Sequence, residues 1–345
     1  MSNYKEIQAL NQSILKKILY SPAEFKKAQE RQNNEESTQD YFVFGTMVDI
    51  MLTGSKTEFD EKFIKVSEDV YPSDSVARVI NGIFSEIMDE YQEDLNFFSL
   101  DAYTDKILQH CKYQDYYSNL KDETRVNKIL TAGADYFMLL QNSVGKTIVT
   151  DIEYAKAVNC VMALKSDEFT KKYSDKNYSK HSKEDLEYLD KVVITFEFEG
   201  LSFKGELDRV VLDHDRKVIT PIDFKTTSKN INGFKHEFWK YRYDFQAAVY
   251  RYGLAKQDFI KELMKVGYVM DDFLYIVVEK ELNNPPMCFE VTKNIIKIGL
   301  SGGKVDNNYY EGFTQAVQRY IYAENNNRWQ YPKEYYVNNG RMSLL

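Results

Sequence analysis

Cysteine, proline and glycine are all scarce in this chain of 345 residues. Its three cysteines, Cys111, Cys160 and Cys288, are far apart and odd in number, which argues against a disulfide framework or a cysteine-rich metal site. This usage is typical of an intracellular protein. With only 6 prolines and 15 glycines, much of the chain should form regular secondary structure.

Long hydrophobic runs and an excess of positive charge are also lacking. The longest apolar runs, such as FLYIVV at 273–278, are too short to cross a bilayer, and the N-terminal residues lack the apolar core of a signal peptide. We therefore expect a soluble cytoplasmic protein with no membrane partner. Because Asp and Glu outnumber Lys and Arg by 53 to 45, binding to nucleic acid would require a local basic surface.

Helix signals mark the N-terminal region. Ser13 precedes ILKKIL, and Ser21-Pro22-Ala23-Glu24 combines a capping serine, a proline at the first helical position and the returning glutamate of a capping box. Each signal predicts a short helix. The polar residues 31–40 predict a loop, and the apolar residues 44–52 predict a helix that Gly54 ends.

From about Lys56 to Asp190 the pattern is mostly helical, without a repeat or a chemical motif. Turn-like breaks interrupt it at YPSDS (71–75), LTAGAD (130–135) and KYSDKNYSKHSKED (172–185). We expect residues 56–190 to form a helical insertion, whose role the residues do not indicate.

The character of the chain changes at Lys191, where β-rich runs begin. VVITFEFEG, LSFKGELDRVVL and KVITPIDFK are separated by Glu199-Gly200 and by residues 213–216, which predicts an antiparallel meander. The remainder predicts a helix at 238–256, strands at 273–279 and 287–291, and a closing helix at 308–324. Helices before and after the strands indicate a mixed α/β or α+β fold, in which residues 1–345 form one domain with a helical insertion.

Polar residues gather on one face of the meander. Asp223 and Lys225 are two residues apart on a predicted strand, so their side chains leave one face and that of Phe224 leaves the other. If the preceding turn closes a hairpin, Asp208 lies opposite Pro221 and diagonal to Asp223. Two carboxylates and a carbonyl, that of Phe224, suit an open Mg²⁺ site, and a neighbouring lysine suits phosphate chemistry. The alternative is a set of solvated charges, because an acidic residue two before a lysine is common by chance.

The surrounding segments resemble the PD-(D/E)XK nuclease superfamily, in particular its exonuclease VIII-like (RecE-type) branch found in phages and prophages. GELD (205–208) is similar to the family's second motif, IDFKTT (222–227) to its third, YDFQAAVY (243–250) to its Tyr-x-x-Gln-x-x-x-Tyr helix, and FGTMVD (44–49) to its Phe-Gly-Thr-x-x-His helix. The likeness extends to NQSILKKILYSPAEF, YIVVEKELNNPP and Trp329, and it covers most of the chain outside about residues 60–185. It implies a restriction-endonuclease-like core, with N-terminal helices at 1–55 and the catalytic sheet within 191–345.

The resemblance also implies roles for individual residues. Asp208, Asp223 and the backbone of Phe224 would hold Mg²⁺, with Mn²⁺ as a substitute, and Lys225 and Gln246 would complete the catalytic set.

Asp49 stands where the family usually has histidine, and it departs from the pattern. Aspartate also coordinates Mg²⁺ or Mn²⁺, so Asp49 could assist the metal. The alternatives are a residue on the helix surface or in a buried salt bridge.

Basic residues concentrate around the third motif. Residues 223–256 contain seven Lys or Arg and three Asp or Glu, a local charge of +4. The side chains expected to contact DNA are Lys229, Arg242, Tyr250 and Arg251. Trp239 lies among them and could stack on an unpaired base, although a solvated basic helix face is the alternative.

The implied activity is a metal-dependent 5′ to 3′ exonuclease that acts on the ends of linear double-stranded DNA and leaves 3′ single strands for recombination. The implied partners are DNA, a recombinase or single-strand annealing protein, and further copies of the chain in a ring; a phage or prophage gene is the implied source. The alternatives are a catalytically impaired DNA-binding or virion-associated module and an endonuclease. Three scattered cysteines argue against the iron–sulfur cluster of some relatives.

Overall fold

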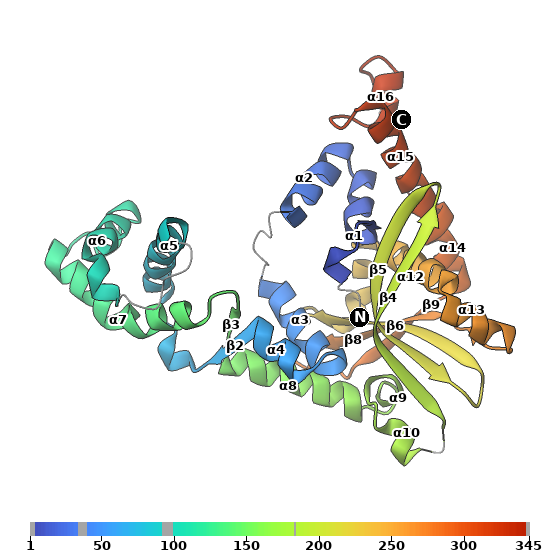
Figure 1. The fold of residues 1–345 in the computed structure, drawn as a ribbon, viewed down its shortest axis with the longest axis horizontal. Coiled ribbons are helices and arrows are strands. Elements are labelled where there is room, and N and C mark those ends of the chain that lie inside the picture. Colours follow the sequence, from blue (N-terminus) through green and yellow to red (C-terminus); the bar gives the residue numbers. More distant parts are fainter. Residues whose placement is uncertain (1–3, 34–39, 92–98, 183, 343–345) are drawn as a thin grey trace. The chain divides into compact units, whose positions relative to one another are not determined.

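The computed structural model describes residues 4–33, 40–91, 99–182 and 184–342 (Figure 1). The chain packs as two compact units, one made of Met1–Gly54 with Val158–Leu345 and the other of Ser55–Ala157. Among the described helices, none is both long and apolar enough to cross a membrane. The first unit is a mixed sheet flanked by helices, so the predicted mixed α/β fold is confirmed.

The main sheet combines antiparallel and parallel pairing. Its strands are β1 (Leu10–Asn11), β4 (Leu186–Phe198), β5 (Leu201–Asp213), β6 (Val218–Thr227), β7 (Val269–Met270), β8 (Phe273–Glu279) and β9 (Met287–Val291). They run in the order β1-β5-β6-β8-β9, with β4 beside β5 and β7 beside β6. Figure 1 labels β4, β5, β6, β8 and β9 of this sheet. β4, β5 and β6 form the predicted antiparallel meander, although β4 begins before Lys191. β6 and β8 are parallel, so the chain between them must cross over the sheet.

The turn between β5 and β6 corrects the predicted register. Asp213 pairs with Val218, so the paired residue on each strand is one position later than expected. The cause lies in the turn, where the Asp213 carboxylate accepts a 2.9 Å hydrogen bond from the backbone N–H of Arg216. This register brings Asp208 level with Asp223. The expectation that Asp208 lies opposite Pro221 is therefore wrong, and the two carboxylates are neighbours across the strands.

Helices cover the sheet and join its strands. In the first unit they are α1 (Gln12–Leu15), α2 (Pro22–Asn33), α3 (Asp40–Thr53), α9 (Lys171–Ser174), α10 (Tyr178–His181), α11 (Phe234–Lys240), α12 (Tyr243–Lys256), α13 (Asp258–Lys265), α14 (Lys293–Ser301), α15 (Phe313–Asn326) and α16 (Lys333–Val337), with 3-10 turns at Tyr4–Glu6, Lys16–Leu19 and Ile231–Gly233. α8 (Asp151–Ser166) contains the boundary between the units. A short hairpin, β10 (Gly303–Val305) and β11 (Asn308–Tyr310), lies between α14 and α15.

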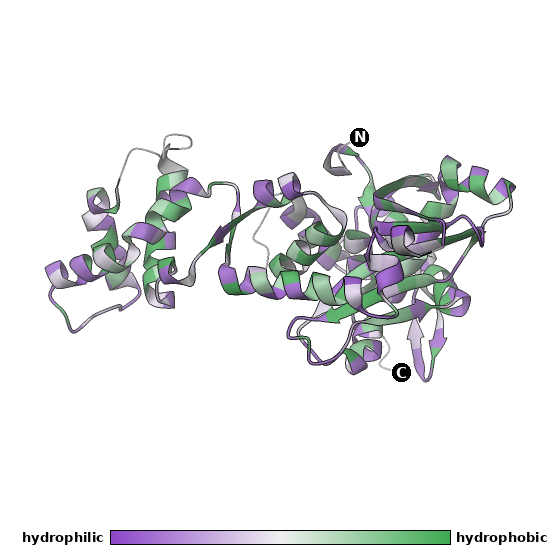
Figure 2. Cartoon of the chain, turned by 90° about the horizontal axis from the view of Figure 1, so that it is seen from below, coloured by the Kyte–Doolittle hydropathy of each residue, from purple (hydrophilic) through white to green (hydrophobic). Residues whose placement is uncertain are grey.

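The hydrophobic core of this unit lies between the sheet and α12. Strand residues such as Ile194, Phe203 and Leu207 are fully or almost fully buried and pack with Phe245 of α12. In Figure 2 the strands are largely hydrophobic, whereas hydrophilic residues recur along the helices. α14 packs closely on α12, since a Cβ added at Gly299 would lie 2.2 Å from a backbone carbonyl of that helix. α12 is thus held rigidly over the sheet.

Some predicted helices have other boundaries. Asn11 caps α1 through a 2.9 Å bond from the N–H of Ile14, in place of Ser13, whereas Ser21 caps α2 as expected at 3.1 Å. α2 continues through Asn33, so the loop predicted at 31–40 starts later, and residues 34–39 of it lie outside the described residues. The helix predicted at 44–52 lies within α3.

Two long predicted helices are each divided. The helix expected at 238–256 is interrupted at Arg242, which has a φ of 56° and whose guanidinium binds the Asp244 carboxylate at 2.9 and 3.0 Å. The helix expected at 308–324 begins only at Phe313, because residues 308–310 pair as β11 and Gly312 follows them. Local side-chain bonds and strand pairing override the helical pattern at both places.

Arg209 on β5 is a polar anchor beneath the meander. It is 0% exposed, and its guanidinium donates to both oxygens of Asp190 at 2.6 and 3.2 Å. The remaining donors reach the carbonyls of Leu52, Tyr173 and Ser174 at 2.8 to 3.0 Å. Every guanidinium N–H is therefore satisfied, and α3 and α9 are fixed to the strand that carries Asp208.

The second unit is mainly helical. Its elements are α4 (Lys56–Lys62), β2 (Phe63–Val66), α5 (Asp74–Tyr91), α6 (Thr104–Tyr113), α7 (Asp122–Asn142) and β3 (Thr147–Thr150), with 3-10 turns at Glu68–Val70 and Leu100–Tyr103. β2 and β3 pair in parallel. The break predicted at 130–135 is wrong, since it lies inside α7, where Gly133 packs against Ile80. This unit ends at Ala157, whereas the predicted insertion runs to residue 190.

Candidate active site

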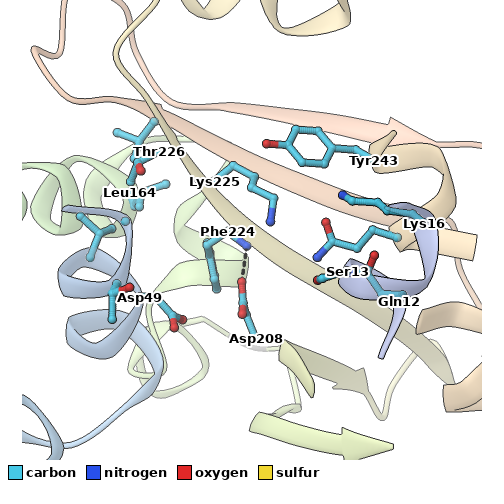
Figure 3. A pocket seen from close by; sticks show the side chains of 15 residues that line it. Gln12, Ser13, Lys16, Asp49, Leu164, Asp208, Phe224, Lys225, Thr226 and Tyr243 are labelled. Atoms are coloured by element: carbon cyan, nitrogen blue, oxygen red, sulfur yellow. Dashed lines mark hydrogen bonds between the residues drawn. The ribbon is translucent and has the colours of Figure 1, made fainter. Parts of the chain in front are cut away.

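A cavity of about 380 Å³ opens where α3, α12 and the N-terminal segment meet β5 and β6 (Figure 3). The predicted residues that line it are Asp49, Asp208, Phe224, Lys225 and Gln246. Asp223 is only 2% exposed and lies against Lys225 and Gln246. The structure therefore brings together every residue predicted to act in catalysis or metal binding.

Asp223 is the centre of this arrangement. Its Oδ1 accepts a 2.9 Å hydrogen bond from Nε2 of Gln246 on α12, and its Oδ2 lies 2.5 Å from Nζ of Lys225. The hydroxyl of Tyr275 lies 3.4 Å from Oε1 of Gln246, which orients the amide with its N–H groups toward Asp223. Lys225 therefore shares a face with Asp223, as the strand alternation predicts.

Asp208 is attached to the same strand by a backbone contact. Its Oδ2 accepts a 2.8 Å hydrogen bond from the N–H of Phe224, drawn as a dashed line in Figure 3. Burial, followed by the charges of Asp223 and Asp49, raises the pKa of Asp208 well above its usual value. Burial also raises the pKa of Asp223, although Lys225 opposes this shift. The pair thus concentrates negative charge that a cation would stabilise.

Lys225 carries a persistent positive charge into the cavity. Burial disfavours that charge, but the carboxylates of Asp223 and Asp208 and the phenol of Tyr243 outweigh it and raise the pKa of Lys225. The ammonium also lies 5.2 Å from the ring centre of Tyr243. Lys225 is therefore protonated at neutral pH and able to stabilise an anion.

Asp49 has a partner that the sequence analysis missed. Its carboxylate forms an ion pair with Lys191 of β4 and accepts a 2.9 Å hydrogen bond from Thr53. Lys191 has a φ of 51°. Its neighbours Asp190 and Val192 pair with Arg209 and Leu207 of β5, so Lys191 lies level with Asp208 although these two residues are not themselves paired in the sheet. Asp49 therefore lines the cavity and is salt-bridged, and its predicted assistance to the metal stays a prediction.

Gly45 explains how α3 approaches the third motif. A Cβ at this position would lie 3.3 Å from Oγ1 of Thr226, which is tight contact. Glycine lets α3 come close to β6 and brings Asp49, one helical turn further on, to the cavity. The Phe-Gly-Thr and Asp-Phe-Lys-Thr-Thr segments thus meet in space.

The carboxylates fit a hard divalent cation. Among the described residues, no three His, Cys, Asp or Glu side chains converge into a complete metal-ligand group. Asp208 and Asp223 can still hold a Mg²⁺ that keeps several waters, as this ion commonly does. Burial raises the pKa of both carboxylates, and the charges of Asp223 and Asp49 raise that of Asp208 further, so a bound cation would stabilise the ionised pair. The predicted ligand role of the Phe224 carbonyl stays a prediction.

The residues predicted to contact DNA are scattered. Lys229 is exposed but lies 2.5 Å from Glu237, and Arg251 donates to the carbonyls of Met270 and Asp271 at 3.0 and 3.3 Å. Tyr250 is 9% exposed and packs in the core, so its expected surface contact is wrong. Its side chain fills the space next to Gly205, where a Cβ would lie 2.9 Å away.

Sequence reasoning also missed the N-terminal side of the cavity. Gln12, Ser13 and Lys16 line it, as does Tyr243 at the start of α12 (Figure 3). NQSILKK carries part of the family likeness, but the sequence does not indicate which strand or helix its polar residues approach. Burial, together with the positive charges of Lys225, Lys17 and Arg242, lowers the pKa of Lys16 to about 8.

Comparison with known proteins identifies the family. The model of a PDDEXK-like domain of unknown function (DUF3799) matches residues 11–310. The chain belongs to this family, and so to the PD-(D/E)XK nuclease superfamily. The RecE-type branch in particular stays a prediction. No curated protein sequence matches the chain.

Two solved structures show weak likeness to the PDDEXK-like chain. One is a protein of Eubacterium rectale that was provisionally assigned as an exonuclease, with 14% identity, coverage of 76% of this chain and 94% of that chain, and a TM-score of 0.35. The other is SSO0001, with 11% identity, coverage of 76% and 84%, and a TM-score of 0.21. Nucleases of the superfamily generally use divalent metals, in agreement with the carboxylate pair found here.

Proposed function

We propose that this PDDEXK-like protein is a metal-dependent DNA nuclease that hydrolyses phosphodiester bonds. The observation that carries the proposal is the contact of one buried carboxylate, Asp223, with both Lys225 and Gln246 beside Asp208. A buried Asp and Lys on one strand could form a purely structural ion pair. Such a pair would not require a second carboxylate with a raised pKa at the wall of an open cavity.

Each residue has a role in the proposed hydrolysis. Asp208 and Asp223 hold the cation, which when bound supplies Lewis-acid stabilisation of charge on the phosphoryl group. The ammonium of Lys225 holds the attacking water or stabilises a phosphoryl oxygen, and Gln246 fixes the orientation of Asp223. The water oxygen bonds to phosphorus and releases a proton to solvent, one ester P–O bond breaks, and the leaving oxygen takes up a proton from solvent.

We further propose, from the motif resemblance, that the substrate is a linear duplex end and that digestion runs 5′ to 3′. The product would be a 3′ single strand for a recombinase or annealing protein. A homo-oligomeric ring around DNA and an origin in a phage or prophage belong to the same proposal.

The test compares linear duplex DNA labelled at the 5′ end, closed circular DNA and single-stranded DNA, with Mg²⁺, Mn²⁺ or EDTA. The wild type should degrade only DNA with ends, and Asp223→Asn and Lys225→Ala should each lower the rate by at least about a hundredfold. Asp258→Asn is the matched control, because its side chain is exposed on α13 and pairs with nearby Lys261.

The alternatives predict other outcomes. Cleavage of closed circles would replace the exonuclease assignment with an endonuclease. Metal-independent DNA binding without cleavage in any metal would support the catalytically impaired module. Progressive shortening of strands that keep their 5′ label would contradict the proposed polarity and leave the hydrolase assignment intact.

A further inference from the structure

A second cavity of about 320 Å³ lies next to the candidate active site. Its walls come from the N-terminal segment, the junction of α11 and α12, and the β10–β11 hairpin. Lys16 lines both this cavity and the first one, so the two spaces share one cationic side chain. In Figure 3 Lys16 lies near Gln12 and Tyr243 at the edge of the candidate active site.

Aromatic rings form much of this second cavity. Tyr20 is 60% exposed and Tyr309 is 57% exposed, although both rings are large and apolar. Trp239 packs against Tyr310 with ring centres 4.7 Å apart, and both rings line the same cavity. Exposed tyrosines beside packed aromatic rings are suited to stacking on a planar ligand.

The charge of the cavity is positive. Lys16 and Lys240 line it, together with Arg242, whose guanidinium is paired with the buried Asp244 carboxylate and lies 5.4 Å from the ring centre of Tyr310. Its acidic residue, Glu311, forms a 2.9 Å ion pair with Arg319. The cavity thus combines cations for phosphate with rings for a base, at a volume typical of small-ligand sites.

We propose that this second cavity binds an unpaired nucleotide of the same DNA strand whose phosphate enters the candidate active site. The base stacks on Tyr20 and Tyr309, and Lys16 contacts the phosphate between the two cavities. This inference rests on the proposed nuclease function. It adds a specific consequence, namely that the strand is unpaired next to the scissile phosphate.

The test uses two labelled probes of equal length, a short oligothymidylate and an abasic strand with the same phosphate backbone. Binding is measured by fluorescence anisotropy with Ca²⁺ in place of Mg²⁺, using full-length protein. Tyr20→Ala and Tyr309→Ala should each weaken binding of oligothymidylate by about tenfold and leave binding of the abasic strand unchanged. Tyr113→Ala is the matched control, because Tyr113 is 89% exposed and does not line the cavity.

A second measurement uses the tryptophans, of which the sequence has only two. In Trp329→Phe protein, oligothymidylate should quench the fluorescence of Trp239, and the abasic strand should not. Equal weakening of both probes in the tyrosine variants, or no weakening at all, would overturn the proposal. Cleavage of linear duplex by the wild type is measured separately. Base-dependent binding without cleavage would refute only the nuclease function. Cleavage without base-dependent binding would refute only this inference.

Discussion

Gln246 on α12 donates its amide Nε2–H to Oδ1 of Asp223 on β6, at 2.9 Å. The bond joins the helix that covers the sheet to the strand that carries the site, across 23 residues of sequence. Because both groups are buried, loss of the amide would leave a carboxylate oxygen without its donor. The helix therefore sets the orientation of the residue on which the proposed chemistry depends.

Replacing Gln246 by Ala should lower the cleavage rate by about tenfold to a hundredfold while the protein stays folded, because Asp223 loses the partner that orients it. The rate on linear duplex and the circular dichroism spectrum check this. Gln257→Ala is the matched control, since Gln257 ends the same helix and donates to Thr195 and Gly253 away from the cavity. Equal effects of the two substitutions would contradict the assigned role.

The ion pair of Asp49 and Lys191 should control metal affinity. Lys191→Met removes a cation next to Asp49 and Asp208, so the Mg²⁺ concentration for half-maximal cleavage should fall by about fivefold. Asp49→Asn leaves Lys191 unpaired beside Asp208, so the same concentration should rise. A Mg²⁺ titration of the initial rate measures both, with exposed Lys261→Met as control. Shifts in the same direction for the two variants would refute this electrostatic role.

Arg209 should be essential for stability. Arg209→Met leaves the buried carboxylate of Asp190 without its guanidinium and removes donors from three carbonyls, so the free energy of unfolding should fall by about 3–5 kcal/mol. Urea denaturation followed by circular dichroism measures it. Arg319→Met, which breaks a partly exposed pair with Glu311, should cost less than about 1 kcal/mol. Similar losses for the two would contradict the buried-anchor interpretation.

The parts of the fold that were predicted correctly depend on local patterns. The meander follows from alternation and turn residues, and the pairing of Asp223 with Lys225 follows from strand geometry alone. The register of Asp208 could not be predicted, because the side chain of Asp213 selects where the turn closes. The break at Arg242 was also hidden, because its guanidinium binds both the nearby Asp244 carboxylate and the carbonyl of Glu311, which is distant in sequence.

The missed site residues share a physical cause. Lys191 lies in an apolar strand pattern and turns toward Asp49 through a left-handed backbone conformation that the sequence does not indicate. Lys16 looks like an ordinary basic residue of a short helix, and only the tertiary structure places it between two cavities. Long-range geometry, rather than residue type, made both residues part of the site.

Lys16 should make strand binding depend on pH. Its pKa is lowered to about 8, first by burial and then by neighbouring positive charges, so the side chain is charged below that pH and neutral above it. A phosphate prefers the charged form, and affinity for oligothymidylate should therefore fall above about pH 8, by up to about tenfold per pH unit. Anisotropy titrations with Ca²⁺ across this range measure the effect. Lys16→Met should bind weakly at every pH, whereas Lys16→Arg should keep its affinity above pH 8 because guanidinium stays protonated. An identical decline in wild type and Lys16→Arg would assign the pH dependence to another group.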